Sequence, residues 1–271
     1  MTPSAANASA LVPETESYRS LFDLSGKSVV LIGAASGIGR ESAYALAAHG
    51  ARVLAADRDA AGVQDLAPTL GNNSEGHAVD LLDARSVEDY AEQVGPVDAL
   101  VFTPAINVRK LIADYTDDDF QRVTGLNLAA SFRLLRAFAP RMAANGGGSI
   151  VGFSSIRATT VEPGQGVYAA TKAGLEMLLK TTASEFGPQN VRANAIRPGV
   201  VETALTEQLR SNEEWNQAYA EKSALGRWAR PSELTGAVVY LVSDASTFVT
   251  GSVITVDGGW TAQDGRYTPP M

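Results

Sequence analysis

Residues 28–40 read Ser-Val-Val-Leu-Ile-Gly-Ala-Ala-Ser-Gly-Ile-Gly-Arg, and their pattern indicates the fold class. An apolar run over Ser28–Gly33 leads into a glycine-rich turn, which a helical pattern then follows. Glycine tolerates positive φ and close approach, and a helix N-terminus attracts a pyrophosphate through its free N–H groups and dipole. A glycine cluster between a strand and a helix predicts a dinucleotide-binding turn. Its expected contacts are Gly33, Ser36, Gly37, Ile38 and Gly39.

The rest of the chain alternates short β-branched runs with helical patterns, which is typical of a parallel sheet covered by helices on both faces. Two long helices are expected, over Asp117–Ala144 and Tyr168–Phe186. We therefore predict an α/β fold, a doubly wound Rossmann-type parallel seven-stranded sheet. The predicted strands are Ser28–Gly33, Arg52–Asp57, Gly76–Asp80, Ala99–Thr103, Gly148–Ser154, Val191–Arg197 and Ser252–Asp257.

The chain is predicted to form one domain. Residues 1–24 lack periodicity and are expected to be a flexible arm or a strap over a neighbouring subunit, while residues 25–271 form a single Rossmann-fold domain. The polar segment 202–223 interrupts the alternation just after a strand end, as a mobile lid over a pocket would. The tail Asp264–Met271 either reaches a neighbour's pocket or is frayed.

Composition limits the partners and the compartment. A formal net charge of −8 disfavours nucleic acid or an anionic membrane, because either would require a basic face. No apolar run approaches the roughly 18 to 20 residues that span a bilayer, and the N-terminus lacks the pattern of a signal peptide. With no cysteine and two histidines in unrelated segments, we assign no metal site. We expect a cytoplasmic protein with a small-molecule substrate.

The second predicted strand ends at Asp57. A carboxylate at this place can accept hydrogen bonds from both hydroxyl groups of the adenosine ribose. A 2′-phosphate beside it would meet like-charge repulsion, although Arg58 could soften that repulsion. The sequence therefore predicts NAD rather than NADP as the cofactor.

Tyr168 and Lys172 stand four residues apart at the start of a predicted helix. This spacing places both side chains on one face, with about 5 to 6 Å between their Cβ atoms. A neighbouring ammonium favours phenolate and lowers the pKa of a tyrosine, which suits acid–base work. The pair also follows a strand end that carries Ser154 and Ser155. Together with the dinucleotide turn, these residues predict hydride transfer between a nicotinamide and an alcohol or ketone.

From about residue 24 to 260 the chain resembles the short-chain dehydrogenase/reductase family, whose motifs occur here in the family's order. The resemblance implies that Tyr168 is the general acid/base and that Ser155 holds the substrate oxygen. It also implies that Lys172 binds the nicotinamide ribose and shifts the pKa of the tyrosine, and that Asn127 anchors a water of a proton relay. Ser155 is preferred to Ser154 because its separation from Tyr168 matches the family's. Further cofactor contacts are implied at Asp80, Leu81, Thr103, Tyr168, Lys172, Pro198, Val201 and Thr203.

The segment Phe102–Thr103–Pro104–Ala105 stands where the family usually has Asn-Asn-Ala-Gly. The exchange removes side-chain hydrogen bonds and a flexible glycine, and Pro104 also lacks an N–H donor. We expect a repacked strand end. The alternative, an NAD-binding sensor without turnover, has this segment as its only support.

Four cations follow predicted strand ends, where open α/β sheets bind ligands: Arg109, Lys110, Arg157 and Arg197. Arg109 and Arg157, with Ser155 and Tyr168, are the candidate substrate-binding residues, and they would suit an anionic group. The alternative is ion pairing of these cations with Asp114, Glu162 or Glu202. The motif order is similar to that of sugar and sugar-acid (gluconate-type) dehydrogenases, and a 3-oxoacyl-carrier reductase is the second interpretation.

The two long predicted helices carry broad apolar faces. The sheet covers one side of each helix, so area remains for a contact between subunits. We predict a homo-oligomer, with a tetramer favoured.

Overall fold

The computed structural model describes residues 18–263. Most of the predicted N-terminal arm (1–17) and the C-terminal tail (264–271) lie outside the described residues. The last part of the predicted arm is packed against the domain, because Leu24 is fully buried and its N–H donates to the His49 carbonyl over 2.8 Å. The structured region therefore begins slightly earlier than residue 25.

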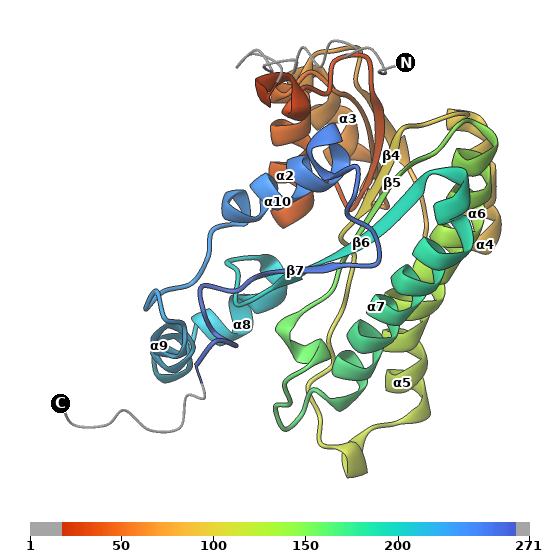
Figure 1. The fold of residues 1–271 in the computed structure, drawn as a ribbon. Coiled ribbons are helices and arrows are strands. Elements are labelled where there is room, and N and C mark those ends of the chain that lie inside the picture. The colour runs from red at the N-terminus through yellow and green to blue at the C-terminus, as the bar shows by residue number, and fades with distance from the viewer. Residues whose placement is uncertain (1–17, 264–271) are drawn as a thin grey trace, which may run out of the picture.

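The described residues form a seven-stranded sheet in which every paired strand runs parallel (Figure 1). The order is β3-β2-β1-β4-β5-β6-β7. The fold prediction is confirmed, and the strands differ from their predicted ranges only at the ends. They are β1 (Ser28–Ile32), β2 (Arg52–Asp57), β3 (Glu75–Ala78), β4 (Ala99–Phe102), β5 (Gly148–Phe153), β6 (Val191–Pro198) and β7 (Val253–Val256).

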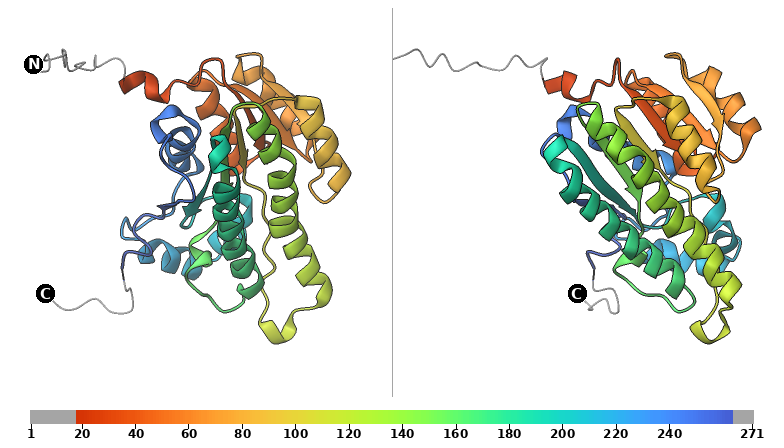
Figure 2. Two further views of the ribbon diagram at one scale, coloured as in Figure 1. Left: turned by 45° about the vertical axis from the view of Figure 1, so that its right-hand side comes forward. Right: turned by 90° about the vertical axis from the view of Figure 1, so that its right-hand side faces the viewer.

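Helices cover both faces of the sheet (Figures 1 and 2). One apolar core joins the sheet to α2 (Gly37–Ala48), α3 (Ala60–Leu70) and α10 (Thr235–Val242). The other joins it to α4 (Ala84–Val94), α6 (Ala130–Ala144) and α7 (Gly166–Phe186). The strands are buried on both sides, so they read in the sequence as nearly continuous apolar runs rather than as alternating ones.

The helix predicted over Asp117–Ala144 has the expected extent but is not regular. It consists of α5 (Asp117–Thr124), a π-helical turn over Gly125–Ala129, and α6. Thr116 begins α5 with a capping box, in which its hydroxyl accepts from the Asp119 N–H and the Asp119 carboxylate accepts from the Thr116 N–H. Asn127 lies in the π-helical turn. Such turns occur frequently at functional sites.

The strand order places β1 beside β4, and the chain leaves these two strands toward opposite faces of the sheet. At such a switch point a crevice opens beyond the carboxyl ends of the strands, and ligands of open α/β sheets bind there. The topology therefore places a candidate site at the residues that follow β1, β2, β4 and β5.

Segment 202–223 contains a 3-10 turn (Ala204–Thr206), α8 (Glu207–Arg210) and α9 (Glu213–Lys222), set apart from the two helical layers (Figure 1). Its base is tied to the sheet end, because Val201 bridges to Ala229 and the Ser223 hydroxyl donates to the Gly258 carbonyl over 3.0 Å. Within residues 18–263, no helix is both long enough and apolar enough to cross a membrane.

Candidate active site

A cleft of about 1300 Å³ lies along the carboxyl ends of β1, β2 and β4. Its wall includes most of the cofactor contacts predicted from the sequence: Gly33, Ser36, Gly37, Ile38, Asp57, Arg58, Asp80, Leu81, Thr103 and Thr203. The residues come from five separate segments of the chain, and the strand order alone brings them to one edge. The cleft runs from the glycine turn to the residues that follow β3 and β4.

The glycine turn at the start of α2 is built from backbone. Gly33 has φ +87° and Gly37 has φ +54°, backbone conformations that residues with a Cβ rarely adopt. A Cβ on Gly39 would lie 1.9 Å from the Gly33 carbonyl oxygen. The glycine turn and the N-terminus of α2 line the cleft with little side-chain bulk, and this cradle fits a dinucleotide pyrophosphate.

Asp57 is fixed beside this turn by backbone donors. Its carboxylate accepts from the Ala35 N–H over 3.2 Å and from the Asp59 N–H over 3.1 Å. A carboxylate held in one orientation at the end of β2 can meet a ribose diol without further ordering.

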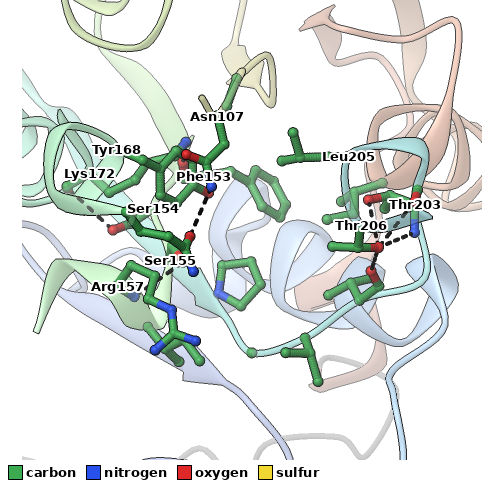
Figure 3. Close-up of a pocket in the computed structure, with 18 of the residues that line it drawn as sticks. Asn107, Phe153, Ser154, Ser155, Arg157, Tyr168, Lys172, Thr203, Leu205 and Thr206 are labelled. Atoms are coloured by element: carbon green, nitrogen blue, oxygen red, sulfur yellow. Dashed lines mark hydrogen bonds between the residues drawn. The ribbon is translucent and has the colours of Figure 1, made fainter. Parts of the chain in front are cut away.

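A second cavity of about 780 Å³ adjoins the first at the ends of β5 and β6 (Figure 3). Ser155, Tyr168 and Lys172 line it, as do Pro198 and Val201 from the predicted cofactor contacts. The two cavities share five wall residues: Ile38, Thr103, Ala105, Thr203 and Leu205. The candidate acid/base group therefore lines a cavity that opens onto the cofactor cleft.

Tyr168 is 8% exposed. Burial raises the pKa of its hydroxyl, while a hydrogen bond with Ser155 and the positive charges of Arg157 and Arg109 oppose that rise. The net direction is opposite to the lowering expected from Lys172. The reason is that removal of a buried phenolate from water outweighs the nearby positive charges.

Lys172 is buried, and its ammonium donates to the Phe153 carbonyl over 2.7 Å (Figure 3). Its Nζ lies 5.7 Å from the centroid of the Tyr168 ring. Burial lowers the pKa of Lys172 to about 8. The same lack of water thus acts on both members of the pair, favouring neutral forms of the phenol and the amine.

The two neighbouring serines have different surroundings. The Ser154 hydroxyl donates to Glu176 Oε1 over 2.7 Å and lies near the Lys172 carbonyl, at 3.3 Å. The Ser155 hydroxyl accepts from the Arg157 N–H over 3.2 Å, and it lowers the pKa of Tyr168. Ser155 is therefore the serine that acts on the tyrosine.

Asn127 is buried behind the cavity wall rather than in it. Its side chain accepts from the Ile106 N–H over 2.9 Å and donates to the Ile106 carbonyl over 2.8 Å. It also donates to Thr171 Oγ1 over 3.2 Å, and Thr171 in turn donates to the Tyr168 carbonyl over 2.7 Å. Asn127 thus joins the loop after β4 to the first turn of α7.

Comparison with known proteins gives the family. A family model described as enoyl-(acyl carrier protein) reductase matches residues 33–261. Galactitol 2-dehydrogenase (L-tagatose-forming) of Cereibacter sphaeroides is 35% identical over 250 residues, which are 90% of this chain and 98% of that protein. The chain belongs to the short-chain dehydrogenase/reductase family. It is therefore an oxidoreductase of a family that uses a nicotinamide cofactor and acts on alcohol or ketone groups.

Two further similar proteins of the short-chain dehydrogenase/reductase family are named for different substrates. A 3-oxoacyl-[acyl-carrier-protein] reductase of Thermotoga maritima is 34% identical over 243 residues, 87% of this chain and 98% of that one. A crystal structure of a putative NAD(P)-dependent gluconate 5-dehydrogenase from Beutenbergia cavernae, with bound NADP, is 36% identical. It superposes with a TM-score of 0.87 over 90% of this chain and 100% of that one. The predicted similarity to sugar-acid dehydrogenases is confirmed.

The strand end that departs from the short-chain dehydrogenase/reductase pattern is tightly packed. Phe102 is buried, and its ring would lie 2.8 Å from a Cβ on Gly152. The Thr103 hydroxyl lies 3.3 Å from the Ile32 carbonyl, and the ring of Pro104 would touch a Cβ on Gly33 at 3.1 Å. Thr103 and Pro104 thus support the glycine turn by packing.

The four cations do not gather as one group. Arg109 and Arg157 line the second cavity, and both pair with Glu162, Arg109 over 2.7 Å. Lys110 pairs with Asp119 over 2.6 Å, and Arg197 makes a two-bond pair with Glu176 over 2.7 and 2.9 Å. Ion pairing is therefore realised for all four, with Glu162 as the only partner foreseen.

Sequence reasoning missed the side chains that complete the second cavity. Tyr219, on α9, donates to Glu162 Oε1 over 2.5 Å. Asn107 donates to Gln165 Oε1 over 2.9 Å, and its own Oδ1 is buried without a hydrogen-bond partner in the described structure. These residues belong to no local motif. Pro163–Gly164 between Glu162 and the helix of Tyr168 was the one available signal, since it marks a turn that returns the chain to the site.

Proposed function

We propose that this protein transfers a hydride between NAD(H) and the carbon of an alcohol or ketone, with Tyr168 as the general acid/base. The observation that carries the proposal is the position of Tyr168, whose pKa responds to Ser155 and whose ring lies beside Lys172, in a cavity of about 780 Å³ that adjoins the glycine-lined cleft. Bound NAD(H) would supply or accept the hydride. A proton must move to or from the substrate oxygen in the same reaction, and that task falls to the protein.

The proposed catalytic residues divide the work between them. Ser155 donates to the substrate oxygen and aligns it with the Tyr168 hydroxyl. Tyr168 gives that oxygen a proton during reduction and takes it during oxidation, and Lys172 holds the nicotinamide ribose and stabilises the phenolate. Asn127 keeps the loop after β4 and the start of α7 in register and anchors a water of the proton relay.

We propose NAD as the preferred cofactor. The support is the Asp57 carboxylate, which two backbone N–H groups hold at the cleft wall. It suits a free ribose diol and repels a 2′-phosphate. Arg58 also lines the cleft and works in the opposite direction. The related structure from Beutenbergia cavernae binds NADP, so a direct comparison of the two dinucleotides is the necessary test.

The proposed substrate is a polyhydroxylated sugar or sugar acid, with Arg109 and Arg157 beside Ser155 and Tyr168 in the substrate cavity. Two guanidinium groups share a single carboxylate, so one positive charge remains available to an anionic group. The relatives named for galactitol and gluconate support this class. The relative named for a 3-oxoacyl carrier substrate supports the alternative.

We propose that segment 202–223 acts as a lid and that residues 25–271 act as one domain. The lid contributes Thr203, Leu205, Leu209 and Tyr219 to the substrate cavity. Its sequence and its place at the end of β6 support a segment that closes over a bound substrate.

We also propose a homo-oligomer, with a tetramer favoured. The π-helical turn, α6 and α7 enclose an apolar groove lined by Leu128, Phe132, Met177 and Leu178. Phe132 is 49% and Met177 is 61% exposed, so the chain by itself leaves this face unpaired. Exposed apolar patches of this kind mark contacts between proteins. A monomer mass by light scattering in dilute solution would contradict the proposal.

The test is a turnover screen of the full chain with NAD and NADP, following the absorbance of the reduced nicotinamide. The substrates are polyols, sugar acids, hydroxy acids and a 3-oxoacyl thioester. We expect turnover with NAD and a hydroxylated substrate. Activity confined to the thioester with NADPH would favour the carrier reductase, and dinucleotide binding without turnover of any substrate would favour the sensor.

A further inference from the structure

Glu162 collects three side chains from three distant segments. Its Oε1 accepts from Arg109 Nη1 over 2.7 Å and from the Tyr219 hydroxyl over 2.5 Å, and its Oε2 pairs with Arg157. Arg109 follows β4, Arg157 follows β5, and Tyr219 belongs to the lid helix α9. One carboxylate thus joins the lid to two strand ends.

Glu162 lies behind the substrate cavity, whereas its three partners line it. Burial raises the pKa of the Glu162 carboxyl, but hydrogen bonds from Tyr219 and Arg109 and the charge of Arg157 lower it by more. The group is therefore an anion that faces away from the substrate and holds the two guanidiniums from behind. Each arginine keeps N–H groups free of Glu162, because only one nitrogen of each pairs with it.

Aromatic rings enclose this cluster. The Tyr219 ring lies 5.6 Å from Trp228 and 5.6 Å from Trp260, between ring centroids. Arg157 lies 5.7 Å from the Trp260 centroid, and Arg109 lies 5.9 Å from that of Trp215. The chain has three tryptophans, so all of them lie at this cluster. Trp228 is 6% and Trp260 is 5% exposed while the lid is in this position.

We propose that Glu162 is a positioning residue that couples the lid to substrate binding: by holding Tyr219, Arg109 and Arg157 together, it makes closure of α9 and alignment of the two guanidiniums one event. With Glu162 in place, the closed cavity presents one net positive charge in a fixed orientation. Without it, the two guanidiniums repel each other and α9 loses the hydrogen bond from Tyr219, keeping the one that its Asn216 carbonyl accepts from Trp228 Nε1 over 3.1 Å. The role in substrate binding rests on the proposed function; the role in holding the lid does not.

Two variants separate the parts of this coupling. Glu162→Gln keeps the shape of the side chain and an acceptor for Tyr219 but removes the charge. Tyr219→Phe keeps the ring between Trp228 and Trp260 but removes the hydroxyl. Glu214→Gln is the matched control, because Glu214 is an exposed residue of the same helix α9.

The first measurement is acrylamide quenching of the intrinsic tryptophan fluorescence, which needs no substrate. Release of α9 exposes Trp228 and Trp260. We therefore expect the quenching constant to rise about twofold for Glu162→Gln and Tyr219→Phe and to stay unchanged for Glu214→Gln. Unchanged quenching in both variants would overturn the proposal. If Glu162→Gln fails to fold, as judged by circular dichroism, Tyr219→Phe alone decides, since it removes a single oxygen atom.

The second measurement is kinetic and uses the substrate found by the turnover screen. We expect Glu162→Gln to raise KM about tenfold or more while kcat changes by less than about threefold, because the chemical groups are untouched. The double variant, Glu162→Gln with Tyr219→Phe, should have a KM little higher than that of Glu162→Gln alone. The coupling would be refuted if the effects of the two single variants on KM added fully in the double variant, or if Glu162→Gln lowered kcat by as large a factor as it raised KM. A failed screen would refute the proposed function and leave the quenching result to judge the lid.

Discussion

The cofactor cleft and the substrate cavity share a wall but are built in opposite ways. The cleft is shaped by backbone: the glycine turn, the N-terminus of α2 and the strand ends, with Asp57 held by two N–H groups. The cavity is shaped by charged and polar side chains from distant segments, with Glu162 at their centre. A backbone site is damaged chiefly by atoms that are added, and a side-chain site by atoms or charges that are removed.

The largest effect should come from removing one atom in the cavity. Tyr168→Phe deletes the proposed acid/base hydroxyl, so we expect turnover to fall by roughly 10² to 10⁴ or more. Dinucleotide binding, followed by fluorescence titration, should stay within a few-fold of the parent, because the cleft is untouched.

Tyr44→Phe is the matched control for that loss. Tyr44 is 36% exposed and its hydroxyl meets Thr69 over 3.3 Å, away from both cavities. It should turn over like the parent. Substantial activity in Tyr168→Phe would remove the proposed mechanism and with it the contrast between the two regions.

The next effect concerns stability. Lys172→Met removes a buried amine whose pKa is lowered from 10.5 to about 8. Below pH 8 the folded chain bears the full cost of the buried charge, and between pH 8 and 10.5 the unfolded chain binds more protons, so the parent gains stability as pH rises. The shift corresponds to about 3 kcal/mol, and the lost hydrogen bond to Phe153 offsets about 1 kcal/mol. Lys172→Met should therefore be inactive yet about 2 kcal/mol more stable at pH 7.

Urea unfolding at several pH values checks this prediction. The stability difference between Lys172→Met and the parent should shrink as pH rises from 8 to 10.5. Lys180→Met makes the same change on the exposed face of the same helix and should show no such dependence. A difference that stays constant over this range would mean that burial of the amine is not what costs stability.

In the cleft, an added methyl should do the damage. Gly39→Ala would place a Cβ 1.9 Å from the Gly33 carbonyl oxygen, so the turn must move. We expect the free energy of unfolding to fall by about 1 to 3 kcal/mol and dinucleotide affinity to fall with it. Gly236→Ala, in α10 with open space around it, should be neutral or slightly stabilising. Equal behaviour of the two variants would end the argument that close backbone approach shapes the cleft.

The smallest effect should be on cofactor choice. Asp57→Asn keeps an acceptor for the Ala35 N–H but removes the charge, so the ratio of NAD to NADP affinity should fall about tenfold. Binding titrations with both dinucleotides measure this without a substrate. Asp59→Asn changes a carboxylate that caps α3 and should leave the ratio unaltered. An unchanged ratio in Asp57→Asn would show that the charge does not select the cofactor.

The same contrast explains what the sequence could predict. The sheet was predictable because each strand is a short apolar run. The glycine turn was predictable because its residues lie close together in the sequence and its close backbone approach requires glycine. Tyr168 and Lys172 were predictable as a pair because one helical turn joins them. Glu162 could be considered as an ion-pair partner but not as a centre, because its contacts with Arg109 and Tyr219 depend on three loops whose paths no local pattern specifies.

Electrostatics was the least predictable part. Spacing alone suggested that Lys172 lowers the pKa of Tyr168, yet burial raises it, and the opposing charges come from Arg157 and Arg109. Spacing gives a distance but not the amount of water around a group, and that amount decides the sign.

The π-helical turn that contains Asn127 adds one residue to what would otherwise be a regular helix. In a regular α-helix, with about 3.6 residues per turn, one extra residue would turn everything after it by about 100°, but the wider π-helical turn absorbs that rotation. Deleting one position from 125–129 would therefore restore a regular helix with α6 still against the sheet and would move Asn127, whereas exchanging a side chain there would keep the turn. The placement of Asn127 thus depends on the length of segment 125–129 as much as on its residue types. Homologues should keep the number of residues in this segment even where the residues themselves differ.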